Sequence, residues 1–356
     1  MKKMRTCILG STGMVGQQFI RLLDNHPYFD LITTTASNNS VGKVYNEATE
    51  WCVEGSFPGY MKNIDIIENN VKSILEHEIE VVFSALPSSV AGNIETELAR
   101  EGIYVFSNTA AHRMDKTVPI LIPEINPDHL DIIKHQRNGN NGFIITNSNC
   151  SVAGIVFGLK PLFNSGIKSV FVTTYQALSG AGRKGLSSMH EGSTVIPYIN
   201  NEEFKVESET RKILGKIDDK KNRITDANMN INATCARVPV KNGHLVSIIV
   251  HLRKQKVIEE IEAQFSNFLG EPQLLKLPTA PKYPIILHNE DDRPQHLKDL
   301  EFNGTSNENG MSVHIGRVRK KGRHLNFLLL VHNTIRGAAG TSVLSAEYAY
   351  SKKCLN

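Results

Sequence analysis

The stretch that most restricts the fold lies at the N-terminus. An apolar run over residues 4–9 leads through a glycine-rich turn, residues 10–16 (GSTGMVG), into helical periodicity over residues 17–25. A buried strand that turns through glycines into a helix is the usual setting for dinucleotide phosphates, because the backbone can come close and the helix N-terminus offers N–H donors. The GxxGxxG spacing differs from GxGxxG, so an ordinary polar turn stays open on this loop alone.

Strand and helix patterns continue to alternate through the first 149 residues. Strand-like runs cover residues 31–36, 81–86, 103–106 and 144–146, with a helical pattern at residues 90–100 between two of them. Such alternation predicts a Rossmann-like, doubly wound α/β sheet. We expect residues 1–149 to form an NADP-binding domain. The second strand ends in SNNS, without the acidic residue that grips a ribose 2′-hydroxyl, which favours NADP over NAD.

The pattern changes after residue 150. A helix to about residue 164, a strand over residues 170–176, a small-residue loop over 178–182 and a helix from about residue 207 to 214 come next. Residues 231–240 and 244–253 flank a turn and are typical of an antiparallel hairpin, and the runs at 312–318 and 325–332 should join the same sheet. We predict an α+β catalytic and dimerisation domain over residues 150–334 with a largely antiparallel sheet. A C-terminal helix within 335–356 should return to complete the first domain.

Composition excludes several function classes. The 356 residues carry 40 Lys and Arg against 36 Asp and Glu, a net charge of +4 without a dominant basic block, so neither nucleic acid nor a membrane surface is expected as partner. No apolar run approaches the ~20 residues of a membrane span, and the start is unlike a signal peptide. We expect a soluble, cytoplasmic protein. Its five scattered cysteines lack CxxC spacing and its histidines lack HExxH, so no metal is expected.

One cysteine stands where a nucleophile could be activated. Cys150 follows the run at 144–146 and precedes an apolar, helix-compatible segment. Backbone N–H groups and the positive end of a helix dipole lower the pKa of a thiol at such a position. A buried structural cysteine is the alternative. A thiolate chemistry with a nicotinamide would also need a proton carrier such as His244, and cations for an anionic substrate, for which Arg237, Arg113 and Lys205 are candidates.

Six motifs in order carry a family resemblance. They are GSTGMVG at residues 10–16, SN at 107–108 with Arg113, TNSNCS at 146–151, QALSGAG at 176–182, RVPV at 237–240 with GH at 243–244, and NTIRGAAG at 333–340. Together they resemble aspartate-semialdehyde dehydrogenases of the archaeal and fungal branch, from residue 5 to about residue 350. The resemblance implies NADPH-dependent reduction of L-aspartyl 4-phosphate to L-aspartate 4-semialdehyde through a cysteine thioester, on the route to lysine, threonine and methionine.

The resemblance also implies roles for individual residues. Cys150 would be the nucleophile, with Asn149 beside it, His244 the acid/base, and Gln176 the residue that orients the acyl group. For the substrate, the implied residues are Arg237 on the α-carboxylate, Glu202 on the amino group, and Arg113 and Lys205 on phosphate. The implied and motif-based cofactor residues are Gly10, Ser11, Thr12, Gly13, Met14, Val15, Ser37, Ser40, Lys43, Ser84, Pro87, Gly180, Gly182, Asn333 and Gly337.

Two positions depart from the family pattern. Ser148 stands where the family often has proline, which should matter little because its neighbours are retained. Asn39 stands where the branch often has an arginine that faces the adenosine 2′-phosphate, so some tolerance of NAD stays open, with Ser37, Ser40 and Lys43 as remaining phosphate ligands.

Two alternative functions remain from the sequence, and the oligomeric state is open. A related thiol reductase could act on malonyl-CoA or N-acetylglutamyl phosphate, although Arg237, Glu202 and Lys205 suit an amino-acid acyl phosphate better than a CoA thioester. A non-catalytic nicotinamide sensor or scaffold could share the fold, but it predicts the decay of at least one catalytic position. The resemblance implies a homodimer or homotetramer built through the second domain, and the sequence itself has no pattern that decides between them.

Overall fold

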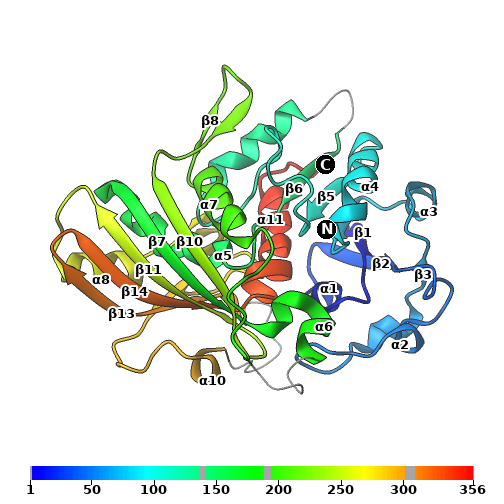
Figure 1. Cartoon of the computed structure of the whole chain (residues 1–356). Helices are drawn as coiled ribbons and strands as arrows, with labels where there is room; N and C mark the ends of the chain where they lie inside the picture. The colour runs from blue at the N-terminus through cyan, green and yellow to red at the C-terminus, as the bar shows by residue number, and fades with distance from the viewer. Residues whose placement is uncertain (1, 137–140, 188–193, 301–308, 356) are drawn as a thin grey trace.

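Two six-stranded sheets lie side by side in the computed structural model, which describes residues 2–136, 141–187, 194–300 and 309–355 (Figure 1). The N-terminal half of the chain builds the sheet on the right of Figure 1, the later half builds the sheet on the left, and the C-terminal helix, in red, lies between them. Among the described residues, no helix combines the length and the apolar character that crossing a bilayer requires.

The first sheet is parallel throughout and has the strand order β3-β2-β1-β4-β5-β6. Its order reverses between β1 and β4, which is the arrangement of a doubly wound nucleotide-binding fold, so this prediction is confirmed. Its strands are β1 (Met4–Leu9), β2 (Phe29–Thr35), β3 (Ile66–Ile67), β4 (Val81–Ser84), β5 (Tyr104–Ser107) and β6 (Phe143–Thr146). Its helices are α1 (Met14–Leu23), α2 (Tyr45–Ala48), α3 (Val71–Glu76) and α4 (Ser88–Arg100).

The second sheet is mixed, with the order β10-β7-β11-β14-β13-β12. Its four central strands pair antiparallel, whereas the outermost strands β10 and β12 pair parallel to their neighbours. The strands are β7 (Ile167–Gln176), β10 (Asn230–Arg237), β11 (His244–Leu252), β12 (Ile285–Leu287), β13 (Val313–Lys321) and β14 (His324–Val331), and β8 (Lys216–Asp218) and β9 (Arg223–Thr225) form a separate hairpin. The fold class predicted from the sequence is confirmed.

The hairpin predicted from β10 and β11 is wrong. Although β10 and β11 follow each other in the sequence, β7 lies between them, parallel to β10 and antiparallel to β11. The apolar alternation of β7, whose Val170 and Val172 are buried, lets it take the central place. This arrangement brings the ends of three strands together: Gln176 pairs with Arg237, and His244 begins the strand on the other side of β7.

Helix α5 (Val152–Leu159) is buried along its whole length against the second sheet. Two glycines one turn apart allow this close approach, since a Cβ on Gly154 would lie 2.9 Å from Val331 and one on Gly158 would lie 2.8 Å from Phe327. This packing fixes the residues just before α5, including Cys150, at the junction of the two sheets.

The remaining helices position parts of the site. Helix α7 (Glu202–Ile213) begins at Glu202 rather than near residue 207, so Glu202 and Lys205 share a helical face. Helix α11 (Gly340–Ser351) packs its Val343 and Leu344 into the core of the first sheet. The other helices are α6 (Gly182–Ser187), α8 (Ile258–Ser266), α9 (Glu271–Leu274) and α10 (His296–Asp299).

Candidate active site

All the predicted catalytic and substrate-binding residues except His244 line one cavity of about 390 Å³. They come from both halves of the chain: Asn149 and Cys150 follow β6, Gln176 ends β7, Arg237 ends β10, and Glu202 begins α7. His244 lies buried behind the wall of this cavity. The fold therefore brings together residues that lie up to 124 positions apart, from Arg113 to Arg237.

The thiol and the imidazole are in direct contact. Cys150 Sγ lies 3.1 Å from His244 Nε2. On the far side of the ring, the backbone N–H of Ala177 donates to His244 Nδ1 over 3.0 Å. Because Nδ1 accepts a hydrogen bond, the proton of the neutral imidazole sits on Nε2 and points at the sulfur. His244 in this arrangement is a hydrogen-bond donor to Cys150.

Burial dominates the titration of both groups. It raises the pKa of Cys150 to about 12, with the Glu202 carboxylate adding to the rise and Arg113 and Arg237 opposing it. Burial likewise lowers the pKa of His244 to about 3, assisted by the charge of Arg237. The sequence predicted that the helix terminus lowers the pKa of Cys150, and this prediction is corrected: its pKa is raised. Asn149 Oδ1 accepts the N–H groups of Ser151 and Val152 at the start of α5, and the hydrogen bond from the Ser151 N–H to the sulfur lowers the pKa of Cys150 less than burial raises it.

Glu202 connects several of these side chains. Its Oε1 accepts hydrogen bonds from Asn149 Nδ2 at 2.8 Å and from Gln176 Nε2 at 2.9 Å. Its Oε2 lies 3.5 Å from Lys205 Nζ. The carboxylate is 4% exposed, so these contacts replace the water that a buried charge has lost. A single acidic group thereby sets the orientation of the residue beside the thiol and of Gln176.

A second buried acid, Glu209, was not predicted from the sequence. Its Oε1 pairs with Arg113 Nη1 at 3.0 Å and its Oε2 accepts the backbone N–H of Asn149 at 2.6 Å. Glu209 lies two helical turns after Glu202, and this seven-residue spacing on an otherwise polar helix is the signal that could have found it. Arg113 also donates to Asn108 O, and its Nε has no hydrogen-bond partner among the described residues, which leaves a donor for an anion.

Two glycines assigned to the cofactor are needed by the thiol site itself. A Cβ on Gly180 would lie 2.6 Å from Arg237 Nη1 and 3.2 Å from His244 Cε1. A Cβ on Gly337 would lie 2.9 Å from the Cβ of Cys150. Asn333, on the same wall, donates to Ser179 Oγ and accepts the N–H of Gly243, the residue before His244. Gly182 does not line the cavity and begins α6 with a φ of +69°.

The glycine turn after β1 fits a dinucleotide. A Cβ on Gly10, which has a φ of +74°, would lie 2.9 Å from Ala85 O, and one on Gly16 would lie 2.4 Å from Gly10 O. A Cβ on Gly13 would meet only Gly10 O, at 3.7 Å, so this side of the turn is open. No side chain caps the N-terminus of α1, whose N–H groups therefore remain available to a phosphate. The turn reaches the thiol, since Val15 lines the same cavity as Cys150.

The other predicted cofactor residues lie around this turn. Ser37 and Lys43 are exposed and Ser40 is buried, in the loop that follows β2, whose last residue accepts the N–H groups of Gly10 and Ser11. Ser84 ends β4, and Pro87 is exposed just before α4. Arg183, which was not predicted, reaches from α6 to Thr12 O at 3.1 Å and so joins the two halves of the chain across the turn.

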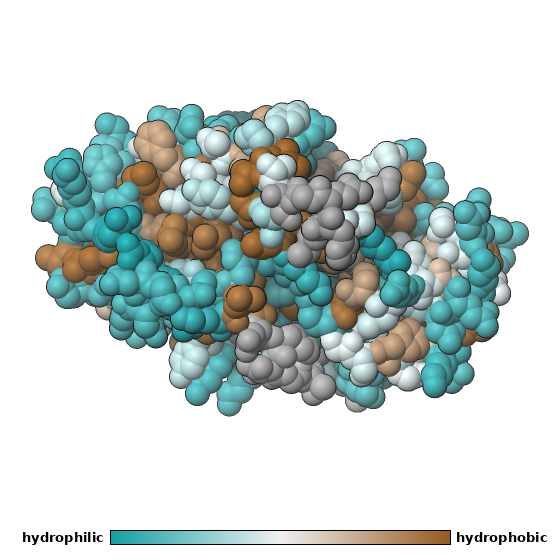
Figure 2. Space-filling model, turned by 60° about the horizontal axis from the view of Figure 1, so that its bottom comes forward, coloured by the Kyte–Doolittle hydropathy of each residue, from teal (hydrophilic) through white to brown (hydrophobic). Residues whose placement is uncertain are grey.

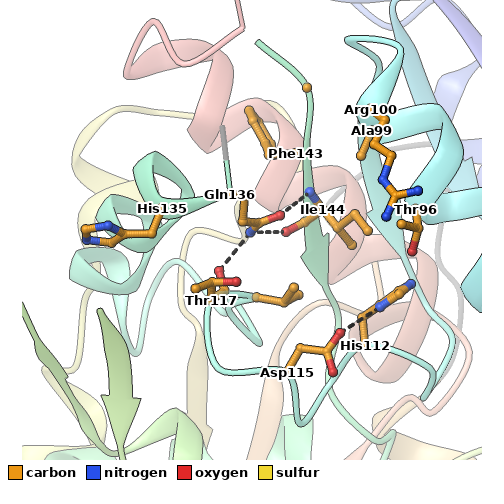
Figure 3. Close-up of a pocket in the computed structure, with 12 residues that line it drawn as sticks. Thr96, Ala99, Arg100, His112, Asp115, Thr117, His135, Gln136, Phe143 and Ile144 are labelled. Carbon is orange, nitrogen blue, oxygen red and sulfur yellow. Dashed lines mark hydrogen bonds and ion pairs between the residues drawn. The ribbon is translucent and has the colours of Figure 1, made fainter. Parts of the chain in front are cut away.

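A larger cavity of about 520 Å³ lies elsewhere, between α4 and β6 (Figure 3). Gln136 donates there to Thr117 O and Ile144 O and accepts the N–H of Ile144, while His112 pairs with Asp115 at 2.8 Å. Figure 3 shows Gln136 joining Thr117 to Ile144, and His112 paired with Asp115, so these contacts hold part of the wall together. Cys150 and its partners do not line this cavity.

The chain matches two family descriptions. "Semialdehyde dehydrogenase, NAD binding domain" matches residues 5–133, and "Semialdehyde dehydrogenase, dimerisation domain" matches residues 159–336. A protein named aspartate-semialdehyde dehydrogenase from Archaeoglobus fulgidus is 42% identical over 351 residues, which is 98% of each chain. A malonyl CoA reductase (NADP) from Metallosphaera sedula is 36% identical and covers 99% of this chain and 98% of its own.

A solved structure is similar over the whole length. The crystal structure of aspartate semialdehyde dehydrogenase with NADP from Candida albicans superposes with a TM-score of 0.88 at 34% sequence identity, covering 99% of this chain and 100% of that one. The resemblance seen in six sequence motifs therefore extends to both sheets and to their connections.

Proposed function

The chain belongs to the semialdehyde dehydrogenase family, and we propose that it catalyses the NADP-dependent reductive dephosphorylation of L-aspartyl 4-phosphate to L-aspartate 4-semialdehyde, in lysine, threonine and methionine biosynthesis. The observation that carries this proposal is the Cys150–His244 pair, 3.1 Å apart, in a cavity that also holds Glu202, Arg237 and Arg113. A nucleophile, an acidic group and two guanidiniums suit an amino-acid acyl phosphate, which carries an ammonium, a carboxylate and a phosphate.

The chemistry begins at sulfur. The Cys150 thiolate attacks the acyl carbon, the bond to the phosphate oxygen breaks, and phosphate leaves with the electron pair, so that a thioester forms on Cys150. When bound, NADPH supplies the hydride that reduces this thioester carbon. The carbonyl oxygen then carries the negative charge, and it regains its double bond as the carbon–sulfur bond breaks and the thiolate of Cys150 departs.

His244 acts in this scheme through its Nε2–H. Since Ala177 N–H occupies Nδ1, the ring donates from Nε2 to whichever nearby atom is negative, first the sulfur and then the oxygen of the tetrahedral adduct. In the free protein the sulfur is a thiol, whose proton is given up to water before the attack. From the attack to the release of the aldehyde the sulfur then begins and ends as a thiolate, so no net proton has to pass through the ring. This role is narrower than the acid/base role expected from the sequence.

Four charged side chains orient the substrate. Arg237, held by a 2.9 Å hydrogen bond to Ala177 O, takes the α-carboxylate, and Glu202 takes the amino group. Arg113 and Lys205 bind the phosphate, for which Arg113 has the free Nε donor. Gln176 keeps the acyl group facing the sulfur, and Asn149 keeps the loop before α5 in place through its hydrogen bonds to Glu202 and Glu209.

The cofactor is NADP in this proposal, with tolerance of NAD. Ser11, Thr12, Gly13 and the start of α1 would hold the pyrophosphate, and the loop that contains Ser37, Ser40 and Lys43 would hold the 2′-phosphate. Gly180, Asn333 and Gly337, which line the cavity beside Cys150, would hold the nicotinamide. We propose residues 1–149 with 335–356 as the cofactor domain and residues 150–334 as the catalytic and dimerisation domain.

Two copies associate through the outer face of the second sheet. Phe171 and Tyr175 on β7 and Ile249 on β11 are large apolar side chains that are exposed there, and Phe171 and Ile249 are direct cross-strand partners. Figure 2 shows apolar groups gathered over the half of the molecule that carries this sheet, on the left. A homodimer, or a tetramer of two dimers, would cover them. The reduced thiol that the reaction needs suits the cytoplasm.

The direct test is an absorbance assay in the oxidative direction. The purified protein is mixed with aspartate semialdehyde, inorganic phosphate and NADP or NAD, and reduced nicotinamide is followed. Reduction that depends on phosphate is expected, and its absence with both cofactors would overturn the proposal. Malonyl-CoA with NADPH serves as the comparison substrate, because one relative is a malonyl CoA reductase. Cys150→Ala should abolish turnover and retain NADP binding, which also separates an enzyme from a nucleotide-sensing scaffold.

A further inference from the structure

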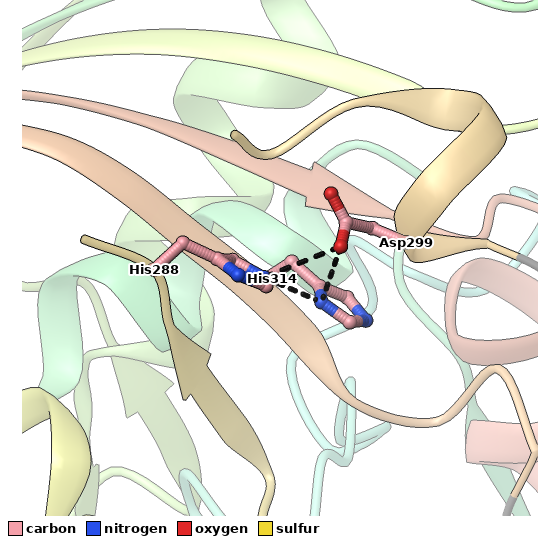
Figure 4. A group of neighbouring side chains, drawn as sticks. All are labelled: His288, Asp299 and His314. Carbon is pink, nitrogen blue, oxygen red and sulfur yellow. Dashed lines mark hydrogen bonds and ion pairs between the residues drawn. The ribbon is translucent and has the colours of Figure 1, made fainter. Parts of the chain in front are cut away.

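The geometry points to a second site: we propose that His288, Asp299 and His314 bind a divalent transition metal of the zinc type. These residues form the one grouping of three metal-ligating side chains found in the part of the chain that the structure describes. Figure 4 shows both imidazoles and the carboxylate directed toward one another from three separate segments. The site lies outside the Cys150 cavity and goes beyond the proposed reaction.

The distances between the ligand atoms match a tetrahedral ion. His288 Nε2 and His314 Nδ1 are 3.0 Å apart, and Asp299 Oδ1 lies 3.5 Å from the first and 3.7 Å from the second. Bonds of about 2.1 Å to zinc in a tetrahedron place neighbouring ligand atoms about 3.4 Å apart. Two imidazoles and a carboxylate are a ligand set that zinc accepts with a water in the fourth position.

The fold explains why the three groups meet. Strands β12 and β13 pair in parallel with Ile286 opposite His314, and His288, two residues on, points to the same face. Gly316 then leaves room for the chain to cross these strands, since a Cβ there would lie 2.5 Å from Arg293 O. That crossing segment runs into α10, whose last residue is Asp299. The spacing of the ligands along the chain follows no known motif, which is why no metal was expected from the sequence.

The protonation states suit metal binding. The side chains of His288 and His314 are 9% and 14% exposed, and burial favours the neutral ring, which has a lone pair for a metal. Burial alone would raise the pKa of Asp299, but hydrogen bonds from Arg293 and the Gln295 N–H hold it below its usual range. The carboxylate is therefore charged.

Arg293 is the group that competes with a cation here. Its Nη2 contacts Asp299 Oδ1, and its Nε lies 2.9 Å from each carboxylate oxygen. For a metal to bind Oδ1, the Nη2 contact has to give way, and Arg293 then keeps its hydrogen bond to Oδ2, which also accepts the Gln295 N–H. The nitrogens of the two histidines now share one hydrogen bond, and the metal would replace the proton between them.

There is room for the fourth ligand. A cavity of about 440 Å³ has His288, Asp299 and His314 in its wall together with Tyr283 and Lys298. A water on the metal would lie in this space. The bound ion would tie β12, β13 and α10 together, and α10 in turn supports the turn before His244, because His296 Nε2 lies 3.1 Å from Gly243 O.

Metal titration tests the proposal directly. The protein is prepared without an affinity tag and with Cys150→Ala, so that the thiol–imidazole pair cannot take the metal, and is dialysed against a chelator. Zn²⁺ or Co²⁺ is then added, and bound metal per chain, the visible absorption of Co²⁺ and the shift in Tm are measured. One tightly held ion per chain with the spectrum of tetrahedral nitrogen and oxygen ligation is expected. If the Cys150→Ala protein, with all three ligand residues intact, retains no metal after gel filtration, the proposal is overturned.

Variants locate the site. Each of three ligand variants should weaken metal binding by at least about tenfold: His288→Gln, His314→Gln and Asp299→Asn. Tenfold is the lower bound because even a residue that only supports a metal ligand changes the affinity by about that factor. His251→Gln is the matched control, because His251 stacks on His324 across β11 and β14 with ring centres 4.6 Å apart. Unchanged affinity in the three ligand variants, or loss of binding in the control, contradicts the proposal. Asp299→Asn retains the size of the side chain and keeps the test open if a histidine variant fails to fold.

Discussion

The reactivity of Cys150 is governed by its surroundings more than by the helix that follows it. Because burial raises its pKa to about 12, the free protein should hold a thiol at neutral pH. Only the thiolate reacts with iodoacetamide, so the alkylation rate should rise about tenfold for each pH unit from about pH 7 to about pH 10. Mass spectrometry of the Cys150 peptide measures this rate, and Cys150→Ala reports labelling elsewhere. If the alkylation rate stopped rising below about pH 8, the pKa of Cys150 would be lowered by the helix terminus rather than raised by burial.

Glu202→Gln extends this prediction. The Glu202 carboxylate is the second cause of the raised pKa of Cys150, after burial. Glutamine retains an acceptor for Asn149 and Gln176 but removes the charge, so the pKa of Cys150 should fall and alkylation at pH 8 should accelerate, by about tenfold if one pKa unit is recovered. A rate equal to that of the parent protein would show that the carboxylate does not act on the sulfur.

Glu209 should matter for phosphate although it does not line the cavity. Glu209→Gln weakens the ion pair that holds Arg113 and the hydrogen bond to Asn149 N–H. Hydrogen bonds to charged groups contribute about 1.5–3 kcal/mol, so KM for phosphate in the oxidative direction should rise about tenfold or more while NADP binding is unchanged. Glu207→Gln is the control, since Glu207 on the same helix accepts Ala233 N–H instead. Equal effects in both variants would indicate a general loss of stability.

At the scale of elements, we expect the loop after β2 to set the preference between NADP and NAD. Asn39 is exposed there, next to Ser40 and one strand away from the glycine turn. Asn39→Arg should place a guanidinium by the 2′-phosphate and raise the ratio of kcat/KM for NADP to that for NAD, by about tenfold for one charge-assisted hydrogen bond. Initial rates with both cofactors measure it. Lys62→Arg, on a separate segment, should leave the ratio unchanged, and an unchanged ratio in Asn39→Arg would place the phosphate elsewhere.

Local sequence patterns predicted the positions of helices and strands well, but they predicted which strands pair less well. The strand, glycine turn and helix from β1 to α1 depend on adjacent residues, so the sequence pattern was sufficient. The β10–β11 hairpin failed because adjacency in the chain does not decide pairing: β7, from some sixty residues earlier, takes the central place. Likewise, the contact of Ala177 N–H with His244 Nδ1 joins two strands, and no pattern in either segment indicates it.

The site was accessible from the sequence mainly through the resemblance. That comparison drew attention to Cys150, His244 and Arg237 together, which the fold then brings into one place. It could not indicate Glu209, which supports other residues from behind, or the tautomer of His244, which depends on a backbone group. The His288–Asp299–His314 cluster is equally invisible in the chain, because it arises from the parallel pairing of β12 with β13.

At the scale of the whole molecule, association should depend on the outer face of the second sheet. Phe171 is 51% exposed on β7 and lies opposite Ile249 on β11. Phe171→Lys places charges that would repel across a twofold interface, so the molecular mass measured by light scattering should fall to that of a monomer at micromolar concentration. Leu274→Lys is the control, because Leu274 is 73% exposed on α9, outside this sheet. An oligomer that persists in Phe171→Lys would move the interface to another face.

The shared carboxylate of Glu202 has a consequence for when the protein is reactive. In the idle enzyme its negative charge disfavours the thiolate of Cys150. If a substrate ammonium binds Glu202, as proposed, it would offset that charge, while Arg113 and Arg237 would still favour the thiolate. Substrate binding would thus lower the pKa of the Cys150 thiol that attacks the substrate. Without substrate the sulfur would stay a thiol, which reacts more slowly than a thiolate with oxidants and electrophiles.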